Sequence, residues 1–502
     1  MNQPAEPSQI SPDTPPAVNR VQSPQGRCRA GFARADITPP VGIYHRMWGA
    51  ALHDRSTGVH RPLTATALWL EPADGISAGQ PAQLMIGIDH CLLDLAETEH
   101  IRSQTAAIAG IDPLDVHLCL SHTHGSAWMS RDRSTLPGGD LIGPYLDRLT
   151  EVCGELAREA QGQSQPVTLV AGQGICGLAR HRDYFDPAIG RYACGFNPTG
   201  ESDQTLLVIR VVNGAGVTVG TLVNYACHPT TLAWQNTLIS PDYVGALRAL
   251  IEDETGGPCL FVQGASGNLG PKEGYVGDPQ VADRNGRQVG YAALSILESL
   301  PPAGTEFVYT GAVVSGAVLG TWAHQPLTGQ GREALAEWNW RRITVPLPYR
   351  AGLPTKQETE QDRVRWLSEQ AKAEQAGDED RVRECRARSE QMTRQLARLN
   401  SLPDGAAYPY RFSAGRCGSI LFVLLPGELY QLFQTELRRR FPDQAILIGT
   451  IVGDWQPGYL PTAETYGLGI YQEQIAMVAP GALELVLSQS IHTIEQLLSA
   501  TR

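Results

Sequence analysis

Two histidines separated by one residue, His122 and His124, are the residues in this chain whose spacing most directly suggests chemistry. They follow an apolar run, 116–120, that is typical of a buried strand. Side chains two residues apart on an extended chain point to the same side, so both imidazoles would project together. Neutral imidazole is the commonest protein ligand of zinc, and a second ring can carry a proton or contact a substrate. Two ordinary histidines would give the same short pattern, so partners elsewhere must decide between the two interpretations.

Four further residues with suitable side chains also come where apolar runs end: His228, Glu428, Tyr459 and Arg180. Each of them alone has a structural explanation. A carboxylate such as Glu428, for example, could simply interact with the dipole of a following helix. Functional sites in α/β proteins collect where strands end, so several such residues together favour a shared site.

The elements that would position these residues follow an alternating pattern. Apolar strands and amphipathic helices alternate from Gly31 to about Pro301, which predicts an α/β fold with mixed β-sheets flanked by helices. Residues 302–344 look rich in strands, and the α/β pattern returns after Pro403. The expected strands are 167–176, 204–212, 217–226, 257–263, 419–425 and 445–452, and the expected helices are 142–160, 240–254, 429–440 and 482–499.

A charged segment interrupts this pattern from residue 356 to about residue 399, where Glu, Gln, Arg and Ala dominate. A break at 375–378 predicts two antiparallel helices, expected to be a solvated surface insertion or a contact in a homo-oligomer. We therefore divide the chain into a tail over residues 1–28, a main domain over 29–344 and 403–502, and a helical insertion over 345–402. The tail is rich in Pro, Gln and Ser and is expected to be disordered.

The composition excludes some classes of partner. A net charge of -12 disfavours binding to nucleic acid or to an anionic membrane surface. No apolar run is long enough for a transmembrane helix, and the first residues lack the pattern of a secretory signal, so a cytoplasmic location is expected. The ten cysteines are scattered without a Cys-x-x-Cys pair and are expected to be free thiols.

As an ordered set, the motifs resemble those of the neutral, non-lysosomal ceramidases and their shorter bacterial relatives. The resemblance spans nearly the whole catalytic domain of that family and implies its fold. The matching segments, in the family's order, are 31–40, 87–89, 121–124, 227–230, 242–245, 425–428 and 458–462.

The resemblance implies a Zn²⁺ site. Carried over residue by residue, the family's ligands correspond to His122, His228, Glu428 and Tyr459. Two imidazoles and a carboxylate are the donor set of catalytic zinc sites, which keep a position for water or substrate. Zinc in such a site lowers the pKa of bound water to about 7 and polarises a carbonyl.

The resemblance also implies two catalytic residues and no further cofactor. His124 matches the family's second histidine, and Arg180 matches its anion-stabilising arginine. His124 would move a proton or anchor the substrate, and Arg180 would neutralise developing negative charge.

The chain also departs from the family. Gly270 stands where the long members carry a serine, which disfavours an acyl-enzyme on that residue. Residues 125–127 differ from the family's motif after the second histidine, and the C-terminal β-sandwich of the long members is expected to be absent. A basic amphipathic stretch that would bind a lipid surface is also lacking. These departures put in question whether ceramide is the substrate, and with it a role in sphingolipid metabolism.

The leading hypothesis is a zinc-dependent hydrolase that cleaves an amide or related bond by zinc-activated water, in a small-molecule or lipid-like substrate. The alternative is a metal-binding relative without catalysis, because the family's serine is lost. A metal-independent hydrolase that uses Ser266 is the weakest of the three hypotheses, because no nucleophile-elbow pattern surrounds this residue.

Overall fold

The computed structural model describes residues 18–73 and 79–499. Residues 1–17 of the expected tail lie outside the described residues. From residue 25 the chain is already part of the main sheet, in a strand that runs to Asp36. The expected boundary at residue 28 therefore falls inside a strand, whose first residue, Gln25, is buried.

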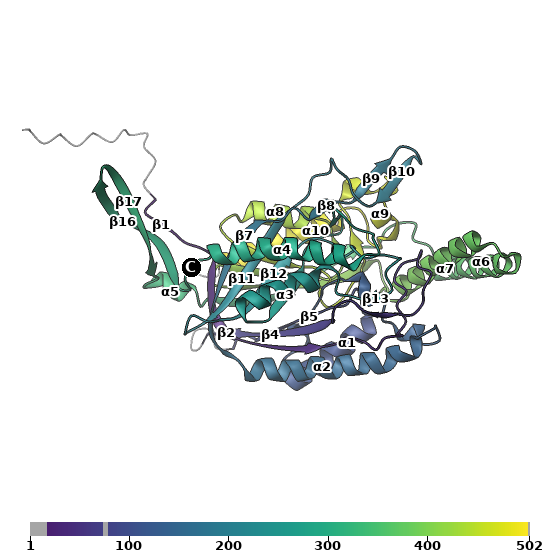
Figure 1. The fold of residues 1–502 in the computed structure, drawn as a ribbon, viewed down its shortest axis with the longest axis horizontal. Coiled ribbons are helices and arrows are strands. Elements are labelled where there is room, and N and C mark those ends of the chain that lie inside the picture. Colours follow the sequence, from purple (N-terminus) through teal and green to yellow (C-terminus); the bar gives the residue numbers. More distant parts are fainter. Residues whose placement is uncertain (1–17, 74–78, 500–502) are drawn as a thin grey trace, which may run out of the picture.

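The largest sheet has eight strands in the order β14-β12-β11-β7-β2-β4-β5-β6 (Figure 1). The pairs β5–β6 and β12–β14 are parallel and the other pairs are antiparallel, so the sheet is mixed. The strands are β2 (Gln25–Asp36), β4 (Thr64–Pro72), β5 (Gln83–Ile88), β6 (Val116–Leu120), β7 (Gln165–Ile175), β11 (Thr205–Asn213), β12 (Thr218–Tyr225) and β14 (Cys259–Gln263).

A second sheet of four strands packs face to face on the first. Its strands are β18 (Trp338–Pro348), β19 (Ala407–Cys417), β20 (Ile420–Leu424) and β22 (Ala445–Gly449). Alternate side chains of a strand face opposite sides. Leu68 of β4 and Phe422 of β20 accordingly meet in the core between the two sheets. Their sequence neighbours Trp69 and Leu421 face outward, toward helices.

Helices cover the two outer faces, which gives four layers in the order helix, sheet, sheet, helix. The helices α1 (Leu95–Ala109), α2 (Ile142–Gly162), α3 (Tyr243–Thr255) and α4 (Pro279–Ser299) pack on the eight-stranded sheet. The second sheet carries α8 (Leu432–Arg440) and α10 (Ala482–Ser499). The mixed α/β fold predicted from the sequence is thereby confirmed.

The remaining elements are short or stand outside this core. Among them, β8–β15 and β21–β23 are two-stranded pairs at strand ends of the core. The short elements are β1 (Arg20–Val21), β3 (Gly58–Val59), β8 (Ala179–His181), β9 (Asp183–Asp186), β10 (Arg191–Cys194), β13 (Leu238–Ile239), β15 (Leu269–Pro271), β21 (Glu428–Leu429), β23 (Tyr459–Leu460), α5 (Gln330–Ala334) and α9 (Tyr471–Ile475).

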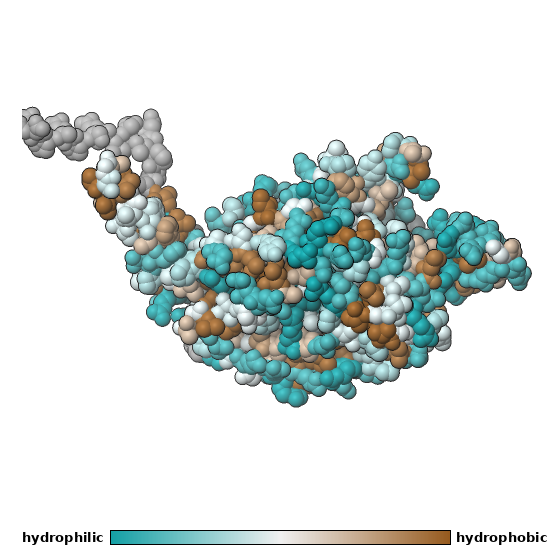
Figure 2. Space-filling model, in the orientation of Figure 1, coloured by the Kyte–Doolittle hydropathy of each residue, from teal (hydrophilic) through white to brown (hydrophobic). Residues whose placement is uncertain are grey.

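Two appendages extend from opposite ends of the molecule (Figure 1). One is an arm of two antiparallel strands, β16 (Thr305–Ser315) and β17 (Ala317–Pro326). Val314 is 82% and Val318 74% exposed near the turn of this arm. Figure 2 shows hydrophobic surface on the arm, which contrasts with the mostly hydrophilic helical appendage.

The other appendage is the helical hairpin of α6 (Lys356–Ala376) and α7 (Glu379–Asn400). Thr355 and Glu358 form a capping box that begins α6, and Gly377, with φ of 69°, ends it. Left-handed glycine is a common helix terminator because it lacks a Cβ. The hairpin is only partly solvated, because α6 buries Thr359 and Ala373 and α7 buries Cys385 and Leu399.

Helix α7 is attached to the main domain by charged pairs. Arg386 contacts Asp54 over 2.7 Å, and Arg133 contacts Glu390 over 2.8 Å with both side chains largely buried. Among residues 18–73 and 79–499, no helix combines the length and apolarity that a membrane crossing requires.

Candidate metal centre

Three potential metal ligands from distant parts of the chain converge on one buried point. His122 follows β6, His228 follows β12, and Glu428 begins β21. The two Nε2 atoms are 3.0 Å apart, and they lie 3.4 Å and 3.2 Å from Oε2 of Glu428. His122 and His228 are each 1% exposed and Glu428 is 7% exposed. The three donor atoms are thus close enough to share a single ion.

Backbone carbonyls hold both rings in this orientation. Nδ1 of His122 lies 2.9 Å from the Cys91 carbonyl oxygen, and Nδ1 of His228 lies 3.0 Å from that of Ser266. A protonated Nδ1 that donates to a carbonyl leaves Nε2 as the free donor atom, which is the usual arrangement of metal-binding histidines. His122 also has a left-handed backbone with φ of 66°. This conformation costs a non-glycine residue of the order of 1 kcal/mol and is characteristic of functional sites.

The charge and hydrogen bonding of Glu428 fit a metal ion. Its Oε2 is buried and makes no hydrogen bond within the described part of the chain, although both imidazoles are near. Burial raises the pKa of Glu428, but contact with His122 and His228 outweighs this effect and holds the pKa well below its usual value. A buried anionic oxygen beside two imidazole nitrogens is the donor set that zinc prefers in catalytic sites.

Tyr459 joins the cluster through backbone pairing. In the parallel pair β21–β23, Glu428 lies opposite Tyr459, and the Glu428 amide donates to the Gly458 carbonyl over 2.9 Å. The Tyr459 hydroxyl is 3.4 Å from Nε2 of His228. Gly427 is in the left-handed region with φ of 75°, and a Cβ there would come within 2.9 Å of the Gly458 oxygen. A glycine before Glu428 is therefore required for the two strands to approach.

Arg182 is the guanidinium that contacts this cluster. Its Nη2 donates to the Tyr459 hydroxyl over 2.9 Å and to the Gly267 carbonyl over 2.6 Å. Arg180, the arginine predicted from the sequence, donates to the Ala179 carbonyl over 3.4 Å. No contact of Arg180 with the metal-ligand cluster is present among the described residues. The two arginines lie two positions apart on one extended segment. The alternation of side chains along a strand therefore could not show which of them contacts the cluster.

His124 lies beside the candidate metal ligands, and its Nε2 has no hydrogen-bond partner among the described residues. Its ring centroid is 5.0 Å from that of His122 and 5.0 Å from that of Trp48. Burial, reinforced by the charges of His122 and His228, lowers the pKa of His124 well below its usual value. Its Nε2 is buried and has no hydrogen-bond partner within the described residues, so this atom can accept a proton or a substrate hydrogen bond.

Cys91 was missed by the sequence reasoning. Its Sγ lies 3.6 Å from Nδ1 of His122, and it forms a second potential metal-binding group with His122 and His124. Since Cys91 lies three residues after β5, beside the end of β6, the parallel pairing of these strands was the signal that could have placed it.

The two residues that concern a serine mechanism are both close to the cluster. Ser266 Oγ is 3.2 Å from Nδ1 of His228. This nitrogen faces away from the point at which Nε2 of His228 meets His122 and Glu428. Gly270 is buried, and a Cβ added there would meet Arg182 and Thr230 at ordinary contact distances of 3.8–4.0 Å. The site therefore has room for a side chain at position 270, which this chain does not use.

Fold and site together define a four-layer α/β protein with a buried His-His-Glu centre. No family model matches the chain, and neither does any curated protein. Among solved structures, neutral ceramidase from Pseudomonas aeruginosa is similar, with a TM-score of 0.62 and 17% identity over 94% of this chain and 74% of that one. A ceramidase complexed with C2 is similar at 16% identity and a TM-score of 0.62, over 93% and 74% of the two chains. The ceramidase-like fold expected from the motifs is thereby confirmed.

Proposed function

We propose that this protein is a zinc-dependent hydrolase that cleaves an amide or a related bond. The observation that carries the proposal is the convergence of His122, His228 and Glu428 on one buried point, where Oε2 of Glu428 has no hydrogen bond from any described residue. A water-excluded donor set of this kind is unfavourable unless a cation compensates it.

Four residues would hold the ion: His122, His228, Glu428 and, more weakly, Tyr459. When bound there, zinc would lower the pKa of water and polarise the substrate carbonyl. In the overall reaction the oxygen of water forms a bond to the carbonyl carbon, the carbon–nitrogen bond breaks, and the amine leaves with a proton.

The remaining residues supply proton transfer and charge stabilisation. His124 is neutral and presents its free Nε2 beside the centre, so it can take a proton from the attacking water and deliver it to the leaving nitrogen. Arg182 stabilises negative charge that develops near the Tyr459 hydroxyl. Arg180 stays a candidate for the same role on the strength of the motif alone.

Metal analysis of the purified protein tests this proposal directly. We expect about one zinc per chain in the wild type, and loss of both metal and amide hydrolysis in His122→Ala and Glu428→Ala. His100→Ala, at an exposed histidine of α1, is the matched control and should retain both. Metal-free protein with full activity would refute the proposal.

Gly270 favours one second candidate, a metal-binding protein without catalysis. The buried space next to Arg182 is consistent with the loss of a reactive side chain at this position. Full metal retention together with no turnover of amides or esters would support this second candidate.

A further inference from the structure

Arg398 on α7 is a buried arginine that has no acidic partner among the described residues. Arg398 is 8% exposed, and its Nη1 donates to Oε1 of Gln395 on the same helix over 3.0 Å. Within the described residues, no carboxylate lies within 4.0 Å of its guanidinium. Arg133 and Arg248 are buried to a similar degree, and each forms an ion pair, with Glu390 and Asp89 respectively. A buried cation without a counter-ion is costly, so such groups tend to be kept for binding.

The neighbours of Arg398 along α7 show which part of the molecule this helix face contacts. Arg394, one turn earlier, donates to the Met47 carbonyl and lies 5.0 Å above the ring of Trp128. Ser401, about one turn later, accepts a hydrogen bond from Gln456. Residues 394, 398 and 401 lie on one face of a helix. That face therefore packs between the loop before Trp48 and the loop that leads to Tyr459.

Both of these loops border the metal centre. The ring of Trp48 is tilted against that of His124 with centroids 5.0 Å apart, and the Tyr459 hydroxyl lies near His228 of the cluster. Electrostatics agree with this position. Burial and the charge of Arg394 lower the pKa of Arg398, whereas Tyr471, Glu428 and Tyr459 raise it.

An aromatic wall that includes Trp48 lies beside His124. Trp48 meets Trp234 and Tyr275 edge-on, with centroid distances of 6.3 Å and 5.6 Å, and the latter two rings are nearly parallel. Aromatic side chains arranged in this way provide apolar surface for a flat or hydrophobic group.

We propose that Arg398 forms an oxyanion-binding subsite beside the metal centre, so that the substrate is an amide bearing a carboxylate or phosphoryl group. The planar guanidinium offers paired donors that match either oxyanion. The acyl group would then rest against the aromatic wall while the scissile carbonyl lies at the metal ligands. The identity of the bound molecule as a substrate rests on the proposed hydrolase function, whereas its negative charge does not.

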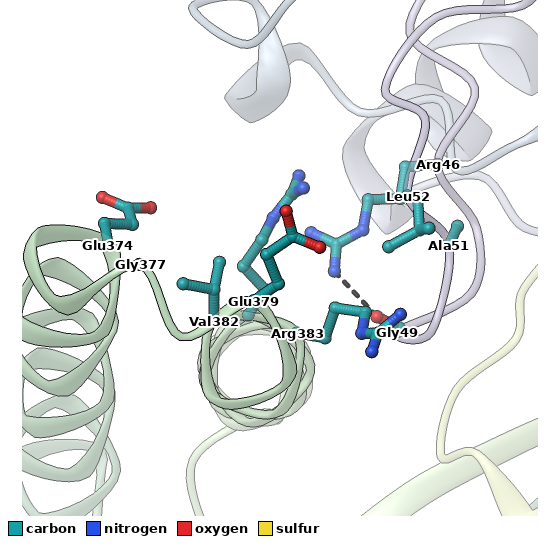
Figure 3. A pocket seen from close by; sticks show the side chains of 10 residues that line it. Arg46, Gly49, Ala51, Leu52, Glu374, Gly377, Glu379, Val382 and Arg383 are labelled. Carbon is teal, nitrogen blue, oxygen red and sulfur yellow. Dashed lines mark hydrogen bonds between the residues drawn. The ribbon is translucent and has the colours of Figure 1, made fainter.

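A cavity at the other end of α7 is a second location at which an anion could bind. It has a volume of about 340 Å³ and lies between α7 and the loop that carries Arg46 (Figure 3). Arg46 and Arg383 share it with Glu374 and Glu379, so its charge is mixed. It also borders no metal ligand, which leaves Arg398 as the better candidate.

Matched benzoyl amides test the subsite. The three probes are N-benzoylglycine, its neutral counterpart N-benzoylglycinamide, and O-phospho-N-benzoylethanolamine, and the readout is release of benzoate. We expect the wild type to prefer an anionic probe by about tenfold or more in kcat/KM, as one charge-assisted contact permits. Whichever anionic probe is preferred identifies the carboxylate or the phosphoryl group as the natural one.

Variants at position 398 separate charge recognition from structure. Arg398→Met should remove the preference while leaving the neutral amide within about twofold, and Arg398→Lys should restore part of the preference. Because the native charge is unpaired, Arg398→Met should melt at the same temperature as the wild type or higher. Arg365→Met, at an exposed arginine of α6, is the matched control and should change neither property.

Binding without turnover distinguishes the two proposals. Calorimetry on metal-free protein should show N-benzoylglycine or the phosphorylated probe binding about tenfold tighter than the neutral amide, and Arg398→Met should abolish the difference. This result without any hydrolysis would support the subsite and contradict the hydrolase. Equal binding of charged and neutral probes, or an unchanged preference in a well-folded Arg398→Met, would overturn the subsite.

Discussion

Glu428 and Tyr459 lie opposite each other in a two-residue parallel ladder, β21–β23, although 31 positions separate them in the chain. The ladder places a carboxylate and a phenol side by side at the buried ends of two loops. Backbone hydrogen bonds therefore fix the relative position of the two Cα atoms from which these side chains project. A site built in this way is held rigidly before any ligand binds.

The Tyr459 hydroxyl is expected to matter for catalysis more than for folding. Tyr459→Phe keeps the ring but removes the oxygen that lies near His228 and accepts from Arg182. We expect a loss of about 10- to 100-fold in kcat, with metal content largely retained. Steady-state kinetics and metal analysis check this. Tyr466→Phe, which removes a hydroxyl bonded to a backbone carbonyl away from the centre, should leave kcat unchanged.

Substitutions at Arg182 and at Arg180 are expected to affect activity differently. Arg182→Lys loses the geometry that reaches both Tyr459 and Gly267, so we expect activity to fall by about 100-fold. Arg180→Lys should remain within about twofold of the wild type. Comparison of kcat for the two folded variants decides the matter, and the reverse ranking would favour the assignment made from the motif.

Position 270 is expected to accept a serine. A Cβ at Gly270 meets neighbours no closer than 3.8 Å, so Gly270→Ser should fold with a melting temperature within a few degrees of the wild type. Because water is the proposed nucleophile, kcat should change by less than about threefold. A large gain in activity would show instead that the reaction benefits from a hydroxyl beside Arg182, and trapping of a covalent acyl-enzyme would identify its role.

The buried carboxyl of Asp454 predicts a pH-dependent stability difference. Burial raises the pKa of Asp454 to about 7 from its usual 3.8, so the folded protein keeps a proton that the unfolded chain has lost. The resulting contribution to the free energy of unfolding is complete below about pH 4 and is lost as the pH rises to about 7. Asp454→Asn cannot ionise and keeps an acceptor for the Gln456 amide.

The Asn variant should therefore gain stability relative to the wild type between pH 4 and pH 7. The gain is expected to be a few kcal/mol in total, about 1.4 kcal/mol for each pH unit in that interval, and constant above pH 7. Denaturant titrations of both proteins across this range measure it. A difference that does not vary with pH would show that the carboxyl of Asp454 is ionised normally in the folded state.

The clustered residues of the candidate metal centre could be predicted from the sequence because each one follows a local pattern. His122, His228 and Glu428 all stand where an apolar run stops, and the end of a strand is a position that sequence periodicity can locate. The order of the motifs then selected these residues from other strand ends. Arg182 could not be chosen over Arg180, because the two lie only two positions apart and a long-range contact, that of Arg182 with Tyr459, is what distinguishes them.

The periodicity of the sequence could not predict contacts between distant segments. The charged composition of α6 and α7 predicted two helices, but it gave no indication that Arg133 pairs with Glu390 across 257 positions. The packing of one sheet on the other is a similar case, since Leu68 and Phe422 meet only through the layering of the complete fold. Local patterns predict elements, whereas their partners depend on long-range burial.

The place at which the α6–α7 hairpin enters the fold has an evolutionary consequence. Its flanking strands β18 and β19 are antiparallel neighbours in which Pro348 lies opposite Ala407, so the chain leaves and rejoins the sheet at adjacent positions. A segment anchored in this way can be lengthened or shortened at its tip, near Gly377, while β18 and β19 keep their register. Changes in the length of the hairpin can therefore accumulate without moving the strand ends that carry His122, His228 and Glu428.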